Sequence, residues 1–149
     1  MIGRAIRWAL LAIAVLIAWP TAPARAQIEL FDAAFADLDL EKEFEAHHAA
    51  KRYQQAFDVG KRLVASRESR LGANHPLTAK AVGNMALELI NVGRIAEAEA
   101  PLKRALAVFE ATQSADSELV VRSATALARV YTELNRGAEA EAMLKRALA

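Results

Sequence analysis

Three histidines are the side chains best suited to bind a metal ion or to transfer a proton. His47 and His48 are adjacent in the sequence. On a helix they would point about 100° apart and could not chelate one ion from a single face. His75 precedes Pro76, a residue typical of the first helical position, so helix capping explains His75 better than catalysis does. We therefore expect core or groove positions for His47 and His48, and no metal site.

Two pairs of carboxylates, Glu97/Glu99 and Glu139/Glu141, could in principle supply a general acid and a general base. They recur because the sequence around them recurs, which favours solvated helix surface. No glycine pattern resembles a phosphate-binding loop, and no nucleophile has an evident base. The sequence contains no cysteine, which excludes disulfides and a lipoprotein-type lipid anchor. We expect no enzymatic activity, no catalytic residue and no cofactor.

The first 26 residues have the pattern of a secretory signal peptide. Arg4 and Arg7 precede an unbroken apolar run from Trp8 to Trp19, and the small residues of Ala24-Arg25-Ala26 suit a signal peptidase. The apolar run has 12 residues, whereas a membrane-spanning helix needs about 20, so a permanent anchor is the weaker alternative. We expect cleavage after Ala26 and a periplasmic or secreted product without a stable membrane anchor.

Cleavage would also change the charge of the protein. The full chain has a formal charge of +1, and three of its arginines belong to the first 26 residues, so the remaining chain would carry about −2. A nearly neutral protein gives no reason to expect binding to nucleic acid or to a membrane surface.

An internal repeat determines which elements must position any site. The segment that begins at Asn84, NMALELINVGRIAEAEAPLKRALA, returns from Ala126 as ALARVYTELNRGAEAEAMLKRALA, and 13 of 24 positions are identical. Apolar residues recur at spacings of three and four, and no stretch alternates as a half-buried strand would. A repeat with a fixed shift, here 42 positions, is typical of stacked helical units. The sequence therefore predicts an all-α fold.

Four helices are expected in these two copies. They run from about Pro76 to Gly93, from Ile95 to Thr112, from the capping segment SADSEL onwards, and from about Ala138. The residues expected to face the core are apolar and have helical spacing: Val82, Met85, Ala86, Leu89, Ile95, Ala98, Leu102, Ala105, Leu106, Phe109, Ala124, Leu127, Ala128, Tyr131, Ala140, Leu144, Ala147 and Leu148.

A weaker copy precedes these two. The same shift applied backwards reaches KRYQQAFDVGKRL, and the helix before it would turn Leu40 and Phe44 inward and place His47 at an apolar position of the later copies. Terminal repeats are often atypical because one face meets solvent rather than a neighbour. We expect a lead-in segment at residues 27–37 and a repeat domain at 38–149, with units of about 38–72, 73–114 and 115–149.

Three segments carry a resemblance to a known family: LGANHPLTAKAVGNMA (71–86), GRIAEAEAPLKRALAVFE (93–110) and NRGAEAEAMLKRALA (135–149). They resemble the tetratricopeptide repeat family, in particular a long-period bacterial subtype similar to the repeats of kinesin light chains. The resemblance implies a right-handed α-solenoid of about three helix-turn-helix units that binds other proteins.

The sequence departs from the family pattern at three places. Asn135 and Gly137 replace the turn glycine and the large residue that follows it, Ser117-Glu118 replaces the His-Pro of the loop, and Gly60 stands where a large packing residue is usual. Pro101 lies within an expected helix, which predicts a bend near that residue.

In resembling proteins the first helix of each pair lines a concave groove, and the register nominates its residues here. The predicted peptide-binding groove comprises Lys80, Asn84, Leu87, Asn91, Arg122, Thr125, Arg129 and Glu133, together with Gly83, Ile90 and Thr132, and with Glu41, Glu45 and His48 from the first unit. The basic residues could hold an acidic side chain or a C-terminal carboxylate, and the asparagines a peptide backbone. The alternative is that these residues form solvated helix faces.

One particular ligand is not expected. Some tetratricopeptide proteins hold acidic chaperone tails with a five-residue carboxylate clamp, and only Asn84 and Arg122 match it here. Glu41 and Glu45 stand where that clamp needs a basic residue and an amide.

Two classes of function stay open. The chain could be an exported binding module for a peptide or a partner's helix, or it could be the sensing part of a larger effector system, since bacterial repeats of this subtype are often fused to or paired with a caspase-like protease domain. The last helix stops short of its counterpart, which leaves Leu144 and Leu148 as an apolar stripe. A second copy or another protein could cover that stripe, or the chain could be a fragment.

Overall fold

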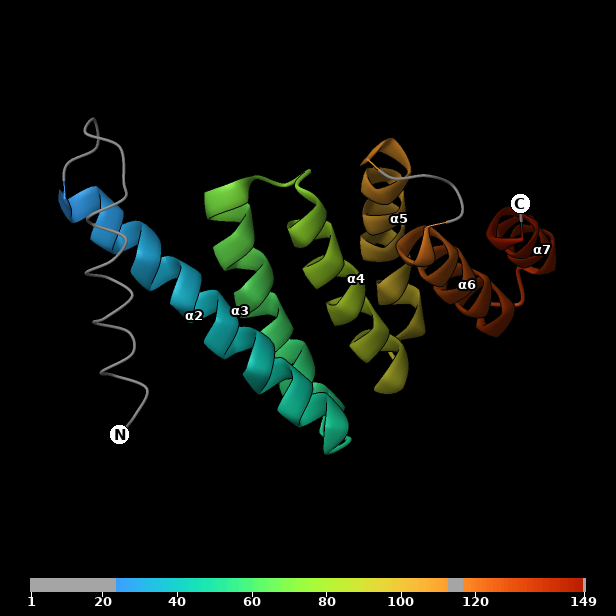
Figure 1. The fold of residues 1–149 in the computed structure, drawn as a ribbon. Coiled ribbons are helices and arrows are strands. Elements are labelled where there is room, and N and C mark those ends of the chain that lie inside the picture. Colours follow the sequence, from blue (N-terminus) through green and yellow to red (C-terminus); the bar gives the residue numbers. More distant parts are fainter. Residues whose placement is uncertain (1–23, 113–116, 149) are drawn as a thin grey trace. The chain divides into compact units, whose positions relative to one another are not determined.

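The structure, a computed structural model, describes residues 24–112 and 117–148 (Figure 1). These residues contain no strand and form six helices: α2 (Ala24–Ala49), α3 (Tyr53–Leu71), α4 (Pro76–Asn91), α5 (Ile95–Thr112), α6 (Glu118–Glu133) and α7 (Gly137–Ala147). The predicted all-α repeat fold is confirmed.

The chain divides into two compact parts, Met1–Asp39 and Leu40–Ala149. Residues 1–23, most of the predicted signal peptide, lie outside the described residues. The description begins at Ala24 with α2, which runs without interruption through the predicted lead-in segment to Ala49. Across the two described ranges, no helix combines the length and the apolar character needed to span a membrane.

Three helix pairs make up the part from Leu40 onwards. The end of α2 packs on α3 through Leu40 and Phe44. Helix α4 pairs with α5 and α6 with α7, and α3 also packs on α4 as α5 does on α6. The bounds of α6 are those of α4 shifted by 42 positions at both ends. The repeat found in the sequence is thus a repeat of helix boundaries.

The turns within the three pairs share one backbone conformation. At each turn a residue with positive φ follows the first helix: Lys51 at 57°, Gly93 at 81° and Asn135 at 57°. The next N–H donates to the carbonyl five residues earlier, at distances of 2.8–2.9 Å (Arg52 to His47, Arg94 to Leu89, Arg136 to Tyr131). This pattern closes a helix end, and asparagine tolerates the left-handed region better than most residues. The asparagine at position 135 therefore preserves the turn.

Helix starts follow the predictions in part. The Nδ1 atom of His75 accepts a hydrogen bond from the N–H of Leu77 at 3.2 Å, so the capping role of His75 is confirmed. Ser117 occupies the N-cap position of α6 without a side-chain capping bond. Pro101 lies inside α5, which continues to Thr112; the bend at this proline stays a prediction.

Alanine lies at the centre of the core. Ala86, Ala98, Ala105 and Ala124 are completely buried, and larger buried residues such as Leu102 fill the space beside them. Small side chains let helix axes approach closely, and the large ones interdigitate between the axes. Most of the predicted core positions are confirmed. Those that stay outside the buried set are Met85, Ile95 and Ala147, which are half-buried, and Leu144 and Leu148, which are exposed.

The first unit exchanges a large and a small residue. In the register of the repeat, Phe44 corresponds to Ala86, and Gly60 corresponds to Leu102. A Cβ atom at Gly60 would lie 3.3 Å from the Phe44 ring and 3.1 Å from the Cβ of Met85. Met85 and Phe44 therefore occupy space that the side chain of a leucine would need, which gives a physical reason for the departure at Gly60.

Candidate functional site

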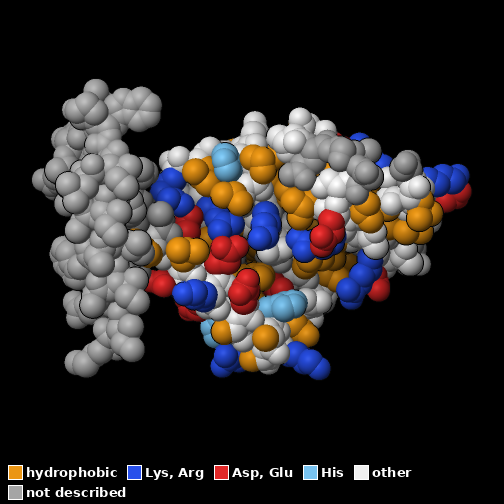
Figure 2. Space-filling view, in the orientation of Figure 1, with side chains coloured by type: hydrophobic (Ala, Val, Ile, Leu, Met, Phe, Trp, Pro, Cys, Tyr) orange, Lys and Arg blue, Asp and Glu red, His pale blue; other side chains and the backbone are white. Residues whose placement is uncertain are grey.

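Two neighbouring hollows lie along the first helices of the three units. Most of the groove residues predicted in the first two units line these hollows. The larger hollow, of about 260 Å³, is lined by Glu41, Phe44, Glu45, Gly60, Leu63, Lys80, Ala81, Asn84 and Arg122. The second hollow, of about 220 Å³, is lined by Phe44, Glu45, His48, Asn84, Leu87, Glu88 and Arg122. Figure 2 shows acidic and basic side chains interspersed on this face.

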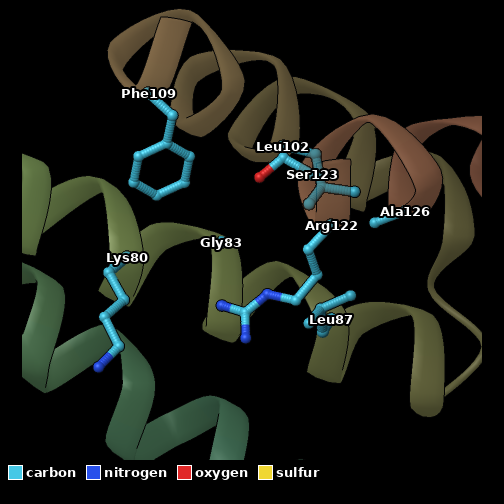
Figure 3. Close-up of a pocket in the computed structure, with 8 residues that line it drawn as sticks. All are labelled: Lys80, Gly83, Leu87, Leu102, Phe109, Arg122, Ser123 and Ala126. Atoms are coloured by element: carbon cyan, nitrogen blue, oxygen red, sulfur yellow. The ribbon is translucent and has the colours of Figure 1, made fainter. Parts of the chain in front are cut away.

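Arg122 joins the second and third units across the groove. Its guanidinium donates a hydrogen bond to the Oδ1 atom of Asn84 at 3.1 Å. In Figure 3 the side chain of Arg122 reaches from α6 over Gly83 and Leu87 of α4. A third hollow, lined by Arg122 and also by Leu102 and Phe109, has a volume of only about 10 Å³. Asn84, Leu87 and Arg122 therefore lie together at one hollow.

Lys80 is engaged by the first unit. Its ammonium lies 3.7 Å from the carboxylate of Glu41, which also pairs at 3.1 Å with the guanidinium of Arg67. Arg67 is buried, and it also donates to the carbonyl of Leu77. Because Glu41 balances part of this positive charge, Lys80 is less available to an acidic ligand than its sequence position suggests.

Six predicted groove residues lie outside the hollows. Ile90 is buried in the core, so its predicted groove position is wrong, and the hydroxyl of Thr132 donates to the carbonyl of Ala128 at 2.9 Å. Asn91 donates to the carboxylate of Glu88 at 3.2 Å, and the hydroxyl of Thr125 donates to the carbonyl of Val121 at 2.8 Å. Arg129 and Glu133 are exposed on α6. The structure thus concentrates the site on the part of the groove between α2 and the start of α6.

Glu88 is a site residue that the sequence interpretation missed. It is 1% exposed, and its carboxylate contacts the Nδ1 atom of His48 at 2.7 Å in addition to Asn91. The ring of His48 stacks on that of Phe44. The register could have indicated that Glu88 is buried, because the corresponding residue of the next unit is Val130, which is apolar and buried. Among the described residues no cluster of three potential ligands could hold a metal ion.

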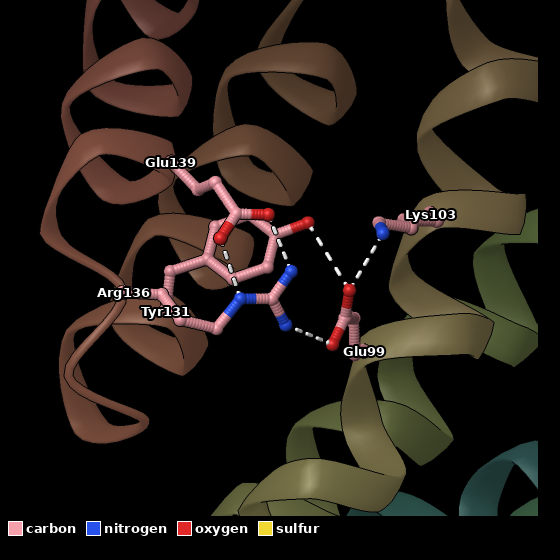
Figure 4. Close-up of polar contacts among 5 residues, drawn as sticks. All are labelled: Glu99, Lys103, Tyr131, Arg136 and Glu139. Carbon is pink, nitrogen blue, oxygen red and sulfur yellow. Dashed lines mark hydrogen bonds and ion pairs between the residues drawn. The ribbon is translucent and has the colours of Figure 1, made fainter.

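The recurring glutamates have structural partners (Figure 4). Glu99 accepts hydrogen bonds from Lys103 and Arg136, each at 2.6 Å, and from the hydroxyl of Tyr131 at 3.4 Å. Arg136 also binds Glu139 through two nitrogens. The bonds from Lys103 and Arg136 hold the pKa of Glu99 below its usual value. A carboxylate held ionised in this way stabilises the junction between α5 and the α6–α7 turn, and it is a poor general acid.

The preceding junction uses the same two basic positions on a different residue. Lys61 and Arg94 correspond in the register to Lys103 and Arg136. They lie over the ring of Phe57 at 4.8 and 5.0 Å from its centroid. Phe57 occupies the register position of Glu99. A pair of cations can stabilise either an aromatic face or a carboxylate, so the junction tolerates this change.

Stacked helix pairs with a regular register define a helical repeat protein. The chain belongs to the tetratricopeptide repeat family, which matches residues 45–111 and 83–149. Tetratricopeptide repeats generally mediate protein–protein interactions.

Two solved structures are similar to this chain. Both are crystal structures of nearly identical TPR-like repeats of a putative kinesin light chain from Podospora anserina, and one of them is a variant with a single substitution. Each is 21% identical, has a TM-score of 0.67 and matches 74% of this chain. The match spans 54% of the length of those chains. Among curated proteins no match is found.

The lowered pKa of Glu99 predicts a specific dependence of stability on pH. A depressed folded-state pKa contributes stability that is present above the unfolded value, about 4.5, and is lost as pH falls through the lower folded value. Glu99→Gln should lower the free energy of unfolding by about 1 kcal/mol near neutral pH, and the difference from the unchanged chain should shrink below pH 4.5. Urea titrations of both chains at a series of pH values measure this difference in the free energy of unfolding.

Glu133→Gln serves as the matched control, because Glu133 is exposed on α6 and takes no part in this cluster. Its effect on unfolding should be small at every pH. A Glu99→Gln deficit that stays constant as the pH falls well below 4.5 would contradict the stabilising role given to the Glu99 carboxylate.

Proposed function

We propose that this chain is an exported interaction module that binds a peptide or a partner's helix in the groove lined by α2, α4 and α6. The observation that carries the proposal is the convergence of Asn84, Leu87 and Arg122 on adjoining hollows. An amide, an apolar side chain and a guanidinium at one place can contact the backbone, a side chain and a carboxylate of one ligand.

Charge complementarity supports a ligand with acidic groups near the third unit. Arg122 and Arg129 are both exposed on α6, and Arg122 is bonded to a neutral amide. On the opposite side, Glu41 and Glu45 of α2 present acidic groups. A nucleic acid would place phosphates against these carboxylates, so a polypeptide is the better partner.

The groove proposal predicts the effect of charge reversal. The double variant Arg122→Glu/Arg129→Glu should reduce capture of the natural partner at least about tenfold, because two favourable charge contacts become repulsive. The measurement uses the immobilised chain, envelope extract from the source cells and quantitative mass spectrometry. Circular dichroism should show unchanged helical content, since both side chains are exposed.

The control is the double variant Arg62→Glu/Lys145→Glu, which makes the same change of charge on the exposed surfaces of α3 and α7. It should capture the same partners as the unchanged chain. If both double variants lose the partners equally, net charge rather than the groove determines binding, and the groove assignment is wrong.

Export depends on the signal peptide proposed for residues 1–26. The arginines before the apolar run and the small residues before Gln27 support cleavage and release into the periplasm or the medium. Membership of a bacterial subtype is part of the same proposal. N-terminal sequencing of the chain expressed with a C-terminal tag should find Gln27 as the first residue in the envelope or medium fraction. A cell-associated product that begins at residue 1 would contradict export.

A second candidate function is that of a sensing part or subunit of a larger effector system, such as one with a caspase-like protease domain. The observation that favours it is the exposure of Leu144 (47%) and Leu148 (88%) on and just after α7, whereas Leu102 and Leu106 at the same positions of α5 are buried. A further helix, a second copy or another chain would cover this stripe. The reading frame after Ala149 and the oligomeric state by sedimentation distinguish these arrangements, and a monomer with no downstream domain would contradict them.

A further inference from the structure

The buried contacts between the first and second units are polar at places where the next junction is apolar. Three buried side chains show this difference: Arg67 on α3, and Thr78 and Glu88 on α4. The residues at the same register positions one unit later are Phe109, Val120 and Val130, and all three are buried. At these positions the first junction therefore has a cation, a hydroxyl and a carboxylate where the second has apolar groups.

Two of these polar side chains join the first unit to the second. The guanidinium of Arg67 on α3 donates a hydrogen bond to the carbonyl of Leu77 on α4 at 3.1 Å. The ring of His48 on α2 contacts the carboxylate of Glu88 on α4 at 2.7 Å. The hydroxyl of Thr78 is completely buried, and no hydrogen-bond partner for it lies within the described residues. Such a hydroxyl makes the docked state less stable than an apolar group of the same shape would.

The apolar core is also divided near the first junction. Among the described residues, one cluster of buried apolar side chains lies mainly on α2 and α3, and a second extends from α4 to α7. Phe57 of α3 belongs to the second cluster, and Ala81 of α4 belongs to the first. Because apolar burial is the main favourable term in folding, the second unit is held more firmly by the third than by the first.

We propose that the first helix pair, residues 40–71, unfolds and refolds as one body while α4–α7 stay folded. Opening returns the buried charges and the hydroxyl at this junction to water, which offsets part of the cost of separating the two units. Opening at the second junction has no such compensation at the equivalent positions, because it would expose Phe109, Val120 and Val130. The second and third units still cover each other when the first is open.

This opening would control the groove, because the first helix pair provides part of its lining. Glu41, Phe44, Glu45 and His48 of α2 line the two larger hollows. Both hollows lose these residues when the pair opens and regain them when it docks. In this respect the inference rests on the proposed function: a partner that contacts both α2 and α4 binds only the docked state and holds it closed.

Native-state amide hydrogen exchange on the full chain, without any partner, tests the opening. The slowest-exchanging amides of α3 and of the end of α2 should share one protection factor, at least about tenfold lower than that of α6. Their protection should fall with urea at one common slope, smaller than the slope for global unfolding, because less surface becomes exposed. Protection in α3 equal to that in α6, or separate slopes for α2 and α3, would overturn the proposal.

The second junction supplies the variant that holds the pair closed. Thr78→Val/Glu88→Val introduces the residues that the next unit has at these two positions. His48 is half exposed and can bind water in place of the lost carboxylate. Protection in α3 should rise at least about tenfold, because the docked state no longer buries this hydroxyl and this carboxylate. Unchanged protection in a variant with native helical content contradicts the proposal; if helical content is lost, Thr78→Val alone should give a smaller rise.

The matched control, Val120→Thr, makes the reciprocal change at the second junction. It should lower the protection of α6 and leave that of α3 unchanged, because the first pair opens while the second junction stays intact. An equal fall in α3 and α6 would mean that α3 exchanges only when the whole chain unfolds, and the proposal would be wrong. Since these measurements need no partner, they also stand apart from the groove: if they agree with expectation while Arg122→Glu/Arg129→Glu captures partners normally, the detachable pair is correct and the groove assignment is not.

Discussion

The structure depends on the close approach of neighbouring helices at completely buried alanines. Ala86, Ala98, Ala105 and Ala124 lie at the centre of the core, where any larger side chain would separate two helices. One helix pair exposes too much apolar surface to be stable alone, so each pair depends on its neighbours for burial. Every unit must present compatible faces to the unit before it and the unit after it. The packing residues therefore recur at a fixed shift in the sequence.

Polar contacts then fix the units against each other. At the second junction Glu99 is held by Lys103 and Arg136, and at the first the equivalent cations lie over Phe57. The groove lies on the first helices, where the copies differ most. The packing positions therefore carry the fold, and they leave the groove positions free to differ between copies.

The sequence predicts the backbone better than the groove. Helical spacing predicts the buried alanines, and the shift between copies predicts equivalent turns at Gly93 and Asn135, because both signals are local or strictly periodic. The contacts of His48 with Glu88 and of Lys80 with Glu41 join different units and depend on side-chain conformation. Gly60 is recognisable in the sequence as a departure, but the ring of Phe44 that occupies its space is identified only in three dimensions.

Amide hydrogen exchange on Ala98→Leu tests the mutual dependence of the units most directly. Overpacking at this completely buried position should cost about 1–3 kcal/mol. If each unit depends on its neighbours, protection should fall in α3 and α7 as well as in α4, α5 and α6, which contain the substitution or pack on the substituted helix. Loss of protection confined to α4, α5 and α6, with α3 and α7 exchanging as in the unchanged chain, would contradict the account.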